Sequence, residues 1–212
     1  MFPEEIETER LRLVRFSRDR VDIDAVHEAL ARDEQTEREL AHVTKSPDDT
    51  LKDTWDRFVD AERQWEEGEK ARYAVFLLDS EHDSGADCDG AGDFAGMAAL
   101  TPHWERRSAR FSLVLKERFW GRGYAGERAI AFMRLAFDRL DLDLVSTGYF
   151  EGNENSRKAI EKYVDRVGGQ YEGRLRNWVP HGDEVLDLHR YTVTREQWER
   201  NRPDDRVEFV DE

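Results

Sequence analysis

The sequence contains one glycine-rich stretch whose residue types and spacing could do chemistry, at residues 118–127 (Arg-Phe-Trp-Gly-Arg-Gly-Tyr-Ala-Gly-Glu). Gly121, Gly123 and Gly126 lie between an alternating apolar run that ends at Leu115 and an amphipathic helical pattern. Glycine lets the backbone approach a ligand closely. The first N–H groups of a helix lack intrahelical partners and can point at an anion. The stretch therefore predicts a strand, a glycine turn and a helix that together hold a phosphate group.

These glycines also satisfy the bare dinucleotide pattern G-x-G-x-x-G, which would indicate a nicotinamide-dependent oxidoreductase. That pattern normally opens the first βαβ unit, and an acidic residue follows at the end of the second strand. Here it comes past the middle of the chain, and Asp141 and Asp143 lie at or before the start of the next predicted strand. The oxidoreductase stays open as an alternative that the position of the motif disfavours.

Apolar periodicity places the strands that must position this turn. The run before the turn alternates with polar residues, and a helical pattern separates it from the next β-rich run. This order of strand, helix and strand predicts a parallel pair. Strands are predicted over residues 7–14, 71–78, 94–101, 109–115, 143–150, 171–175 and 185–193.

Helical spacing of apolar residues predicts the helices. Pro47 suits the first position of one of them, and Gly68 ends it. Trp198 should pack inward from the last helix, and the chain from Asn201 should fray. The predicted helices cover residues 22–33, 47–67, 129–140, 194–200, and the segment from Ser156 to the glycines at 168 and 169.

The charge balance restricts the partners of this chain. There are 33 basic and 48 acidic residues, which give a formal net charge of -15. Nucleic-acid binding normally needs a basic face, so we expect no nucleic-acid partner. Arginine far outnumbers lysine among the basic residues. High acidity with few lysines predicts a halophilic source, because molar salt screens surface repulsion.

Other compositional features exclude further classes. Cys88 is the only cysteine, so no internal disulfide or cysteine-based zinc cluster can form. Five aspartates in the loop at 79–93 fail the spacing of a calcium-binding EF-hand, and we expect a disordered acidic loop and no metal. The sequence contains neither a signal-peptide pattern nor about 18 consecutive apolar residues. We therefore expect a cytoplasmic protein without a membrane partner.

A second pattern accounts for the whole neighbourhood of the glycine turn. Arg118-x-x-Gly121-x-Gly123 is followed by Tyr124-Ala125, and then Asn153-x-Asn155-Ser156 opens the next helix. This arrangement resembles the acetyl-CoA signature of the GNAT superfamily of N-acetyltransferases. Residues 8–13, 119–125, 171–176 and 187–198 resemble its RimJ/RimL branch, which modifies protein N-termini. The resemblance covers nearly the entire chain.

The resemblance implies a single α/β domain over residues 1–200, followed by an acidic C-terminal tail over residues 201–212. The domain would have a central mixed, mostly antiparallel sheet with helices on both faces. Its expected activity is direct transfer of the acetyl group of acetyl-CoA to a primary amine, either a protein N-terminal α-amine or a small amine. The resemblance also allows a homodimer. A non-catalytic acyl-CoA-binding or regulatory protein is the alternative within this fold.

The resemblance also implies how CoA is held. Backbone N–H groups of residues 118–126 would bind the pyrophosphate, and the edge of residues 113–115 would pair with the pantetheine arm. Arg128 could contact phosphate or lie in solvent, and both readings stay open. The implied cofactor-binding residues are Leu113, Val114, Leu115, Arg118, Gly121, Arg122, Gly123, Tyr124, Ala125, Gly126, Asn153, Asn155 and Ser156.

The sequence offers fewer candidates for catalytic residues than for cofactor-binding residues. Many relatives protonate the departing thiolate with a tyrosine seven residues after the asparagine, but here that position holds Ile160, so Ser156 is the candidate donor. Asn153 and Ser156 would also be favoured as helix caps whatever the function. A carboxylate acting through water could take the proton of the amine. Glu151, or His181 with Asp183, are the candidates for this base.

Overall fold

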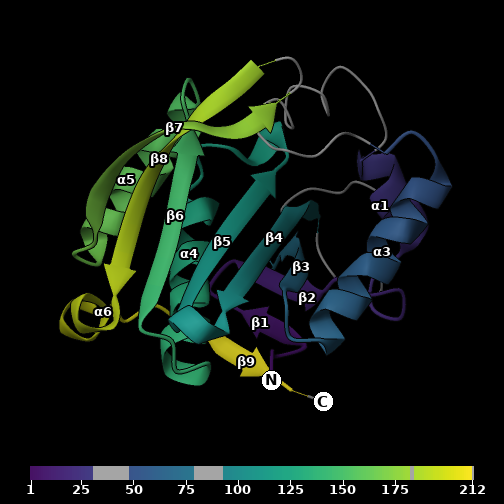
Figure 1. The fold of residues 1–212 in the computed structure, drawn as a ribbon. Coiled ribbons are helices and arrows are strands. Elements are labelled where there is room, and N and C mark those ends of the chain that lie inside the picture. Colours follow the sequence, from purple (N-terminus) through teal and green to yellow (C-terminus); the bar gives the residue numbers. More distant parts are fainter. Residues whose placement is uncertain (31–47, 79–92, 182–183, 212) are drawn as a thin grey trace.

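The computed structural model describes residues 1–30, 48–78, 93–181 and 184–211, with the side chain of His181 excepted. Within this part of the chain one nine-stranded sheet runs in the order β7-β8-β6-β5-β4-β3-β2-β1-β9 (Figure 1). Its single parallel pair is β5 with β6, so the predicted mixed, mostly antiparallel sheet is confirmed. The strands are β1 Glu5–Glu7, β2 Leu11–Arg15, β3 Ala71–Leu77, β4 Phe94–His103, β5 Ser108–Leu115, β6 Leu144–Phe150, β7 Gln170–His181, β8 Glu184–Thr194 and β9 Glu208–Val210.

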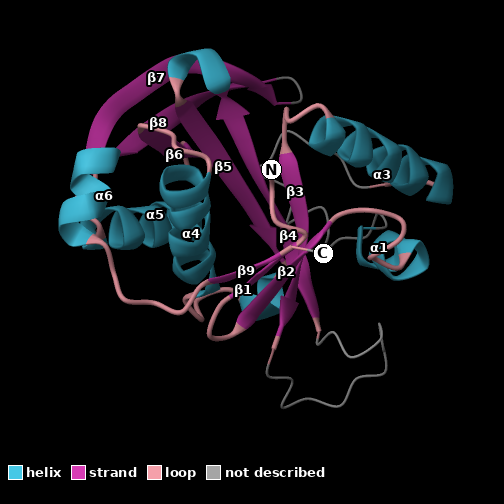
Figure 2. Cartoon of the chain, turned by 90° about the horizontal axis from the view of Figure 1, so that it is seen from below, coloured by secondary structure: helices cyan, strands magenta, loops and turns pink. Residues whose placement is uncertain are grey.

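Helices cover both faces of the sheet, as predicted: α4, α5 and α6 lie on one face, and α1 and α3 on the other (Figure 2). None of the described helices is long and apolar enough to cross a membrane. The helices are α1 Ile23–Leu30, α3 Leu51–Glu66, α4 Tyr124–Arg134, α5 Glu154–Arg166 and α6 Arg195–Asn201, with short 3-10 turns at Trp104–Arg106 and Glu117–Phe119 and a π-helical turn, Leu135–Arg139, that continues α4.

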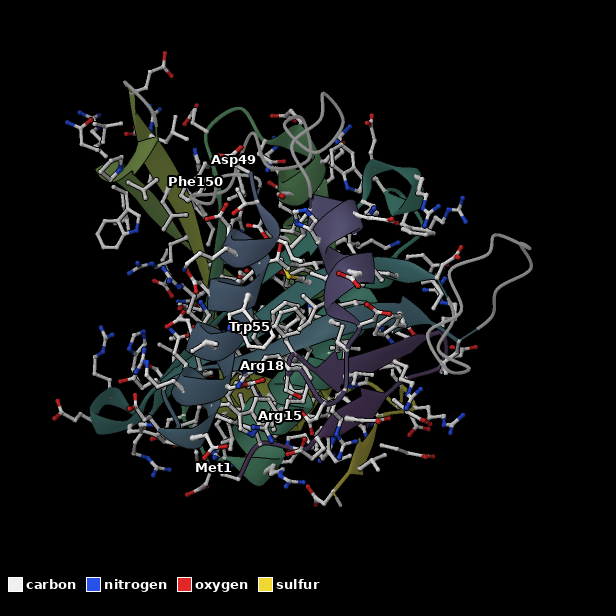
Figure 3. The ribbon with its side chains drawn as sticks, turned by 90° about the vertical axis from the view of Figure 1, so that its right-hand side faces the viewer. Met1, Arg15, Arg18, Asp49, Trp55 and Phe150 are labelled. Carbon is white, nitrogen blue, oxygen red and sulfur yellow. The ribbon has the colours of Figure 1, made fainter. Side chains whose placement is uncertain are left out.

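Each face of the sheet has its own core. The larger cluster surrounds α4, whose residues 128–133 are all buried. On the other face Phe16 of the segment after β2 stacks on Phe58 of α3, with ring centroids 4.0 Å apart. Full burial of a phenylalanine contributes about 1.5–3 kcal/mol, so this pair fastens α3 to the sheet. At the rim of this face Arg18 lies over the ring of Trp55 (Figure 3).

Three local predictions were wrong at the ends of the chain and of one helix. The strand predicted over residues 7–14 is a hairpin, since the hydroxyl of Thr8 accepts the N–H of Leu11 and turns the chain between β1 and β2. The helix predicted from Pro47 begins at Leu51, where Thr50 and Asp53 form a capping box. The tail after Asn201 was expected to fray, but part of it forms β9, which pairs with the otherwise free edge of β1.

The feature of the fold that matters most for function is the divergence of β5 and β6. The two strands pair only from Ser108 to Arg110 on β5 and from Leu144 to Ser146 on β6 (Figure 1). Beyond that point β5 stays paired with β4, and β6 stays paired with β8. The sheet therefore splits into two halves, and the second half of β5 has an edge without a partner strand.

Candidate active site

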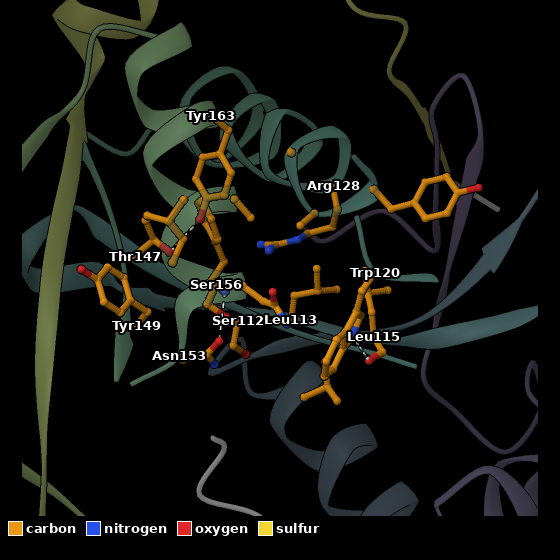
Figure 4. Close-up of a pocket in the computed structure, with 18 of the residues that line it drawn as sticks. Ser112, Leu113, Leu115, Trp120, Arg128, Thr147, Tyr149, Asn153, Ser156 and Tyr163 are labelled. Atoms are coloured by element: carbon orange, nitrogen blue, oxygen red, sulfur yellow. Dashed lines mark hydrogen bonds between the residues drawn. The ribbon is translucent and has the colours of Figure 1, made fainter. Parts of the chain in front are cut away.

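A cleft of about 1530 Å³ lies where the strands diverge (Figure 4). It is lined by β5 from Arg110 to Leu115, by β6 from Ser146 to Phe150, by the glycine turn and by the start of α5. The cleft runs through the split, because side chains of both faces of β5 line it. The predicted glycine turn, strand edge and helix start are thus brought together in one site.

The glycine turn has the geometry that only glycine adopts readily. Gly121 and Gly123 have φ angles of 75° and 88°, and Gly123 is the N-cap of α4. The N–H of Gly126 donates to the carbonyl of Gly123 at 3.0 Å and is therefore occupied. The N–H groups of Tyr124 and Ala125, in the first turn, have no intrahelical acceptor and point along the helix axis. The helix start adds about half a positive charge, so this turn suits a phosphate.

A clamp that the sequence did not predict holds this turn in place. Glu127 in the first turn of α4 accepts the hydroxyl of Thr8 at 2.6 Å, and the backbone N–H and Nε of Arg10 at 2.8 Å each. Arg10 also donates to the carbonyl of Arg122 at 3.1 Å and lies over the ring of Tyr124. The β1–β2 turn and the glycine turn are therefore fixed to each other, and Arg10 lines the cleft beside the phosphate-binding groups.

The free edge of β5 faces the cleft with particular backbone groups. The N–H of Lys116 donates to the carbonyl of Ala95 on β4 at 2.9 Å. Backbone groups alternate in direction along an antiparallel strand, so those of Leu113 and Leu115 point toward the gap while those of Val114 point toward β4. The carbonyl of Leu115 accepts the indole N–H of Trp120 at 2.8 Å. Leu113 thus keeps both an N–H and a carbonyl for a ligand, and Val114 contributes its side chain only.

The start of α5 forms the opposite wall. The side-chain oxygen of Asn153 accepts the N–H of Ser156 at 3.0 Å, which confirms the capping interpretation and leaves the amide nitrogen of Asn153 available as a donor. Asn153, Asn155 and Ser156 all line the cleft. Tyr163 is buried, and its hydroxyl lies 2.9 Å from that of Thr147 on β6, so it belongs to the core beneath the cleft.

The arginines of the predicted site differ in position. Arg122 lines the cleft, whereas Arg118 packs over the ring of Phe119 at 4.6 Å and is not among the lining residues. Arg128 also lines the cleft, but it is buried and lies against the ring of Phe111, so the expectation of a solvent-exposed side chain is wrong. Two lysines of α5, Lys158 and Lys162, also line the cleft. No motif singled out these lysines, because only the fold places them beside the glycine turn.

Glu151 lies at the end of β6 and is engaged away from the cleft wall. Its carboxylate is 2.9 Å from Nε2 of His189 and 3.4 Å from Arg174. Nδ1 of His189 is 3.0 Å from the hydroxyl of Tyr171, so the three side chains form a hydrogen-bonded row. The other candidate base falls outside the description, since the side chain of His181 and all of Asp183 are among the residues not described.

The face of the cleft toward α1 and α3 is basic. Arg57, Lys70, Arg110 and Arg190, which we call the basic wall, come from α3, the segment before β3, β5 and β8. Arg57 pairs with Asp48, and Arg190 lies over Trp178 at 4.9 Å. Burial, with Arg72 and Arg110 nearby, lowers the pKa of Lys70 to about 8. A lowered lysine pKa is the sign of a desolvated and locally positive environment.

No cluster of three metal-ligating side chains occurs in the described ranges. The acidic loop discussed for calcium lies outside them, apart from Asp93, as does most of the segment between α1 and α3.

Residues 10–163 match the family model of the acetyltransferase (GNAT) domain, and the chain therefore belongs to the GNAT family. It is an acetyl-CoA-dependent N-acetyltransferase. The residues fit the CoA that this family uses: positive-φ glycines and unpaired helix N–H groups for phosphate, and a strand edge without a partner for an extended amide chain.

Solved structures of the same fold span nearly the whole chain. A GCN5-related N-acetyltransferase from Brucella melitensis matches with a TM-score of 0.71 and 18% identity, covering 94% of this chain and 82% of its own. Spermidine N-acetyltransferase from Vibrio cholerae, in complex with CoA and spermine, matches with 0.66 and 16%, covering 89% and 98%. A candidate ribosomal-protein-serine acetyltransferase from Vibrio cholerae matches with 0.67 and 18%, covering 92% and 99%. A comparison with curated protein sequences gives no match.

Proposed function

We propose that this enzyme acetylates the α-amine at a protein N-terminus, as the RimJ/RimL branch does. The observation that carries the proposal is the cleft that passes through the split sheet. Its α4 and α5 side offers the phosphate turn and the edge of Leu113, and its α1 and α3 side presents the basic wall, where a second substrate would bind. Two substrates can then meet from opposite faces, which suits direct transfer in a ternary complex.

Each chemical task of the transfer has a candidate group in this cleft or, for the base, beside it. Bound acetyl-CoA supplies an acyl group activated as a thioester. The N–H of Leu113 would stabilise the oxyanion, because a fixed donor in a water-poor site acts most strongly where charge develops. Ser156 would give a proton to the departing thiolate. Glu151, through water and the adjoining His189, would take the proton of the amine.

The basic wall bears on the choice of acceptor. Like charges repel by several kcal/mol at short range in a partly buried site, so this wall disfavours a polycation. The spermidine acetyltransferase shares the fold, but the basic wall would weaken binding of a polyamine here. A peptide whose first residues carry carboxylates suits the wall better, and the structural likeness to the ribosomal-protein-serine acetyltransferase is compatible with a protein acceptor.

Release of free CoA should be followed with peptides that share one N-terminal residue and carry acidic, neutral or basic residues at the next two positions, together with spermidine and free amino acids. Acidic peptides should react fastest. A Ser156→Ala variant should lower kcat with little change in KM for acetyl-CoA. If spermidine reacts faster than every peptide, the proposal of a protein N-terminus as the acceptor is wrong. If CoA binds but no amine reacts, the chain is the non-catalytic acyl-CoA-binding alternative.

The composition of the sequence supports two further proposals, a halophilic source and a cytoplasmic location. A halophilic source predicts that the melting temperature rises between dilute buffer and molar potassium chloride, since the net charge of -15 is then screened. Equal stability in both would remove this proposal. We also propose a cytoplasmic location and leave the homodimer to a measurement of mass in solution.

A further inference from the structure

Arg128 brings a buried positive charge into the site. It is 3% exposed, and its Nε and Nη1 have no hydrogen-bond partner among the described residues. Its contacts are the rings of Phe111, at 4.9 Å, and Phe132, at 5.4 Å. Burial lowers the pKa of this guanidinium to about 10, which leaves it charged at neutral pH. These two nitrogens are shielded as well as unpaired within the described part of the chain. A buried cation with unpaired donors is costly and calls for an anionic partner or other acceptors.

Arg128 lies where the acyl end of the donor must come. With the phosphates held at the glycine turn beside the end of β5, an arm that follows the free edge of β5 would pass Leu115 and Leu113 toward Phe111. Figure 4 shows the guanidinium of Arg128 pointing into the pocket, between Leu113 on one side and Ser156 with Tyr163 on the other. The end of the split near the paired residues, at Phe111 and Thr147, would therefore receive the acyl group, and we call it the acyl pocket.

We propose that this acyl pocket also accepts a short acyl chain that ends in a carboxylate, held by Arg128, so that the enzyme uses dicarboxylic acyl-CoA donors besides acetyl-CoA. The inference rests on the transfer proposed above. A carboxylate accepts two parallel N–H bonds from a guanidinium and neutralises its charge, whereas an acetyl methyl group can do neither. The rings of Phe111 and Phe132, which lie 6.0 Å apart and 69° to each other, would pack against the ion pair and keep water out.

The chemistry balances as it does for acetyl transfer. The acceptor nitrogen attacks the thioester carbonyl carbon, the new N–C bond forms, and the C–S bond breaks. The ammonium form of the acceptor first releases one proton to water. The second proton, lost by the attacking nitrogen, is matched by the one that the departing thiolate gains. The distal carboxylate takes no part and remains on the amide product, so the acceptor changes from a cation to an anion.

Isothermal titration without any acceptor tests the proposal, with succinyl-CoA, butyryl-CoA, acetyl-CoA and CoA as probes. Butyryl-CoA matches the chain length of succinyl-CoA but has a methyl group in place of the carboxylate. Succinyl-CoA should bind at least about tenfold more tightly than butyryl-CoA, because a charge-assisted bidentate pair forms only with the former. In Arg128→Met this preference should disappear while CoA binds as before, and Arg128→Lys should keep part of it.

Arg122→Met is the matched control, because Arg122 lines the phosphate end and its loss should weaken all four probes equally. Equal binding of succinyl-CoA and butyryl-CoA to the wild type would overturn the proposal, and this comparison holds even if Arg128→Met does not fold. A preference that survives in Arg128→Met would also overturn it, as would an equal loss for every thioester, which would make Arg128 a donor to a carbonyl. Failure of all four probes to bind would instead overturn CoA-dependent transfer itself.

Discussion

The two sides of the cleft are built in different ways. The donor side relies on backbone: two glycines at positive φ, the start of α4 and the free edge of β5. The acceptor side relies on side chains from four separate segments, the basic wall. Backbone groups recognise what every CoA thioester has in common, whereas side chains can change with the acceptor. We therefore infer that binding of the donor is encoded by local sequence, whereas the proposed acceptor site depends on tertiary placement.

The largest effect should follow a change in the backbone of the donor side. In Gly123→Val the side chain opposes the φ of 88° and occupies the phosphate turn. CoA should bind at least about 100-fold more weakly, because N–H bonds to a charged group contribute about 1.5–3 kcal/mol each. Titration with CoA measures this loss.

Gly173→Val is the matched control for Gly123→Val. Gly173 also has a positive φ, of 140°, but it lies on β7 outside the cleft lining with no atom near an added Cβ. Both variants should melt at a similarly lowered temperature, and only Gly123→Val should lose CoA. If both variants keep CoA, the glycine turn is not the phosphate site.

The clamp between the two turns should have a smaller effect. Glu127→Gln removes the charge that holds Arg10, and about a five- to tenfold weaker affinity for CoA is expected, since Arg10 is partly exposed and the ion pair is screened. Glu196→Gln removes a fully surface ion pair with Arg200 on α6 and should change nothing. A Glu127→Gln enzyme with wild-type affinity would show that the phosphate turn needs no support.

Removing a charge from the basic wall should change the preference among acceptor peptides and leave CoA binding unchanged. Arg110→Gln should lower the ratio of kcat/KM for acidic over neutral peptides about three- to tenfold, as expected for loss of one nearby charge. Arg106→Gln, at an exposed arginine outside the cleft, is the control. Weaker CoA binding in Arg110→Gln with an unchanged peptide ratio would contradict the division into donor and acceptor sides.

The smallest effect is a pH dependence of the basic wall. The pKa of Lys70 is lowered to about 8, so its charge is present below that pH and is lost above it. The same peptide ratio should therefore fall about two- to threefold from pH 7 to pH 9. A shared N-terminal residue cancels the titration of the acceptor amine. Lys70→Arg should hold the ratio constant, and a ratio that falls equally in both enzymes would assign the effect to another group.

Much of the donor side could be predicted from the sequence, because it is encoded within short segments. The spacing of the glycines predicted the turn, and Asn153 and Ser156 predicted the start of α5. The clamp of Glu127 with Thr8 and Arg10 joins residues more than 110 positions apart, which no periodicity can reveal. The burial of Arg128 was equally hidden, since its neighbours Phe111 and Tyr163 come from other elements.

The fold could be predicted where the apolar periodicity was strong. Prediction failed where a segment's structure depends on the strand with which it pairs. Residues 208–210 form a strand only because β1 offers a free edge. Glu151 follows β6 as expected, but its pairing with His189 depends on the register of β6 with β8.

The most direct test of the central claim is titration of the wild-type protein with acetyl-CoA and, separately, with NAD. If the glycine turn holds the phosphates of CoA while the free edge of β5 pairs with the pantetheine arm, acetyl-CoA should bind with 1:1 stoichiometry and NAD should give no heat of binding. Binding of NAD without binding of acetyl-CoA would contradict the account and return the glycines to the dinucleotide pattern.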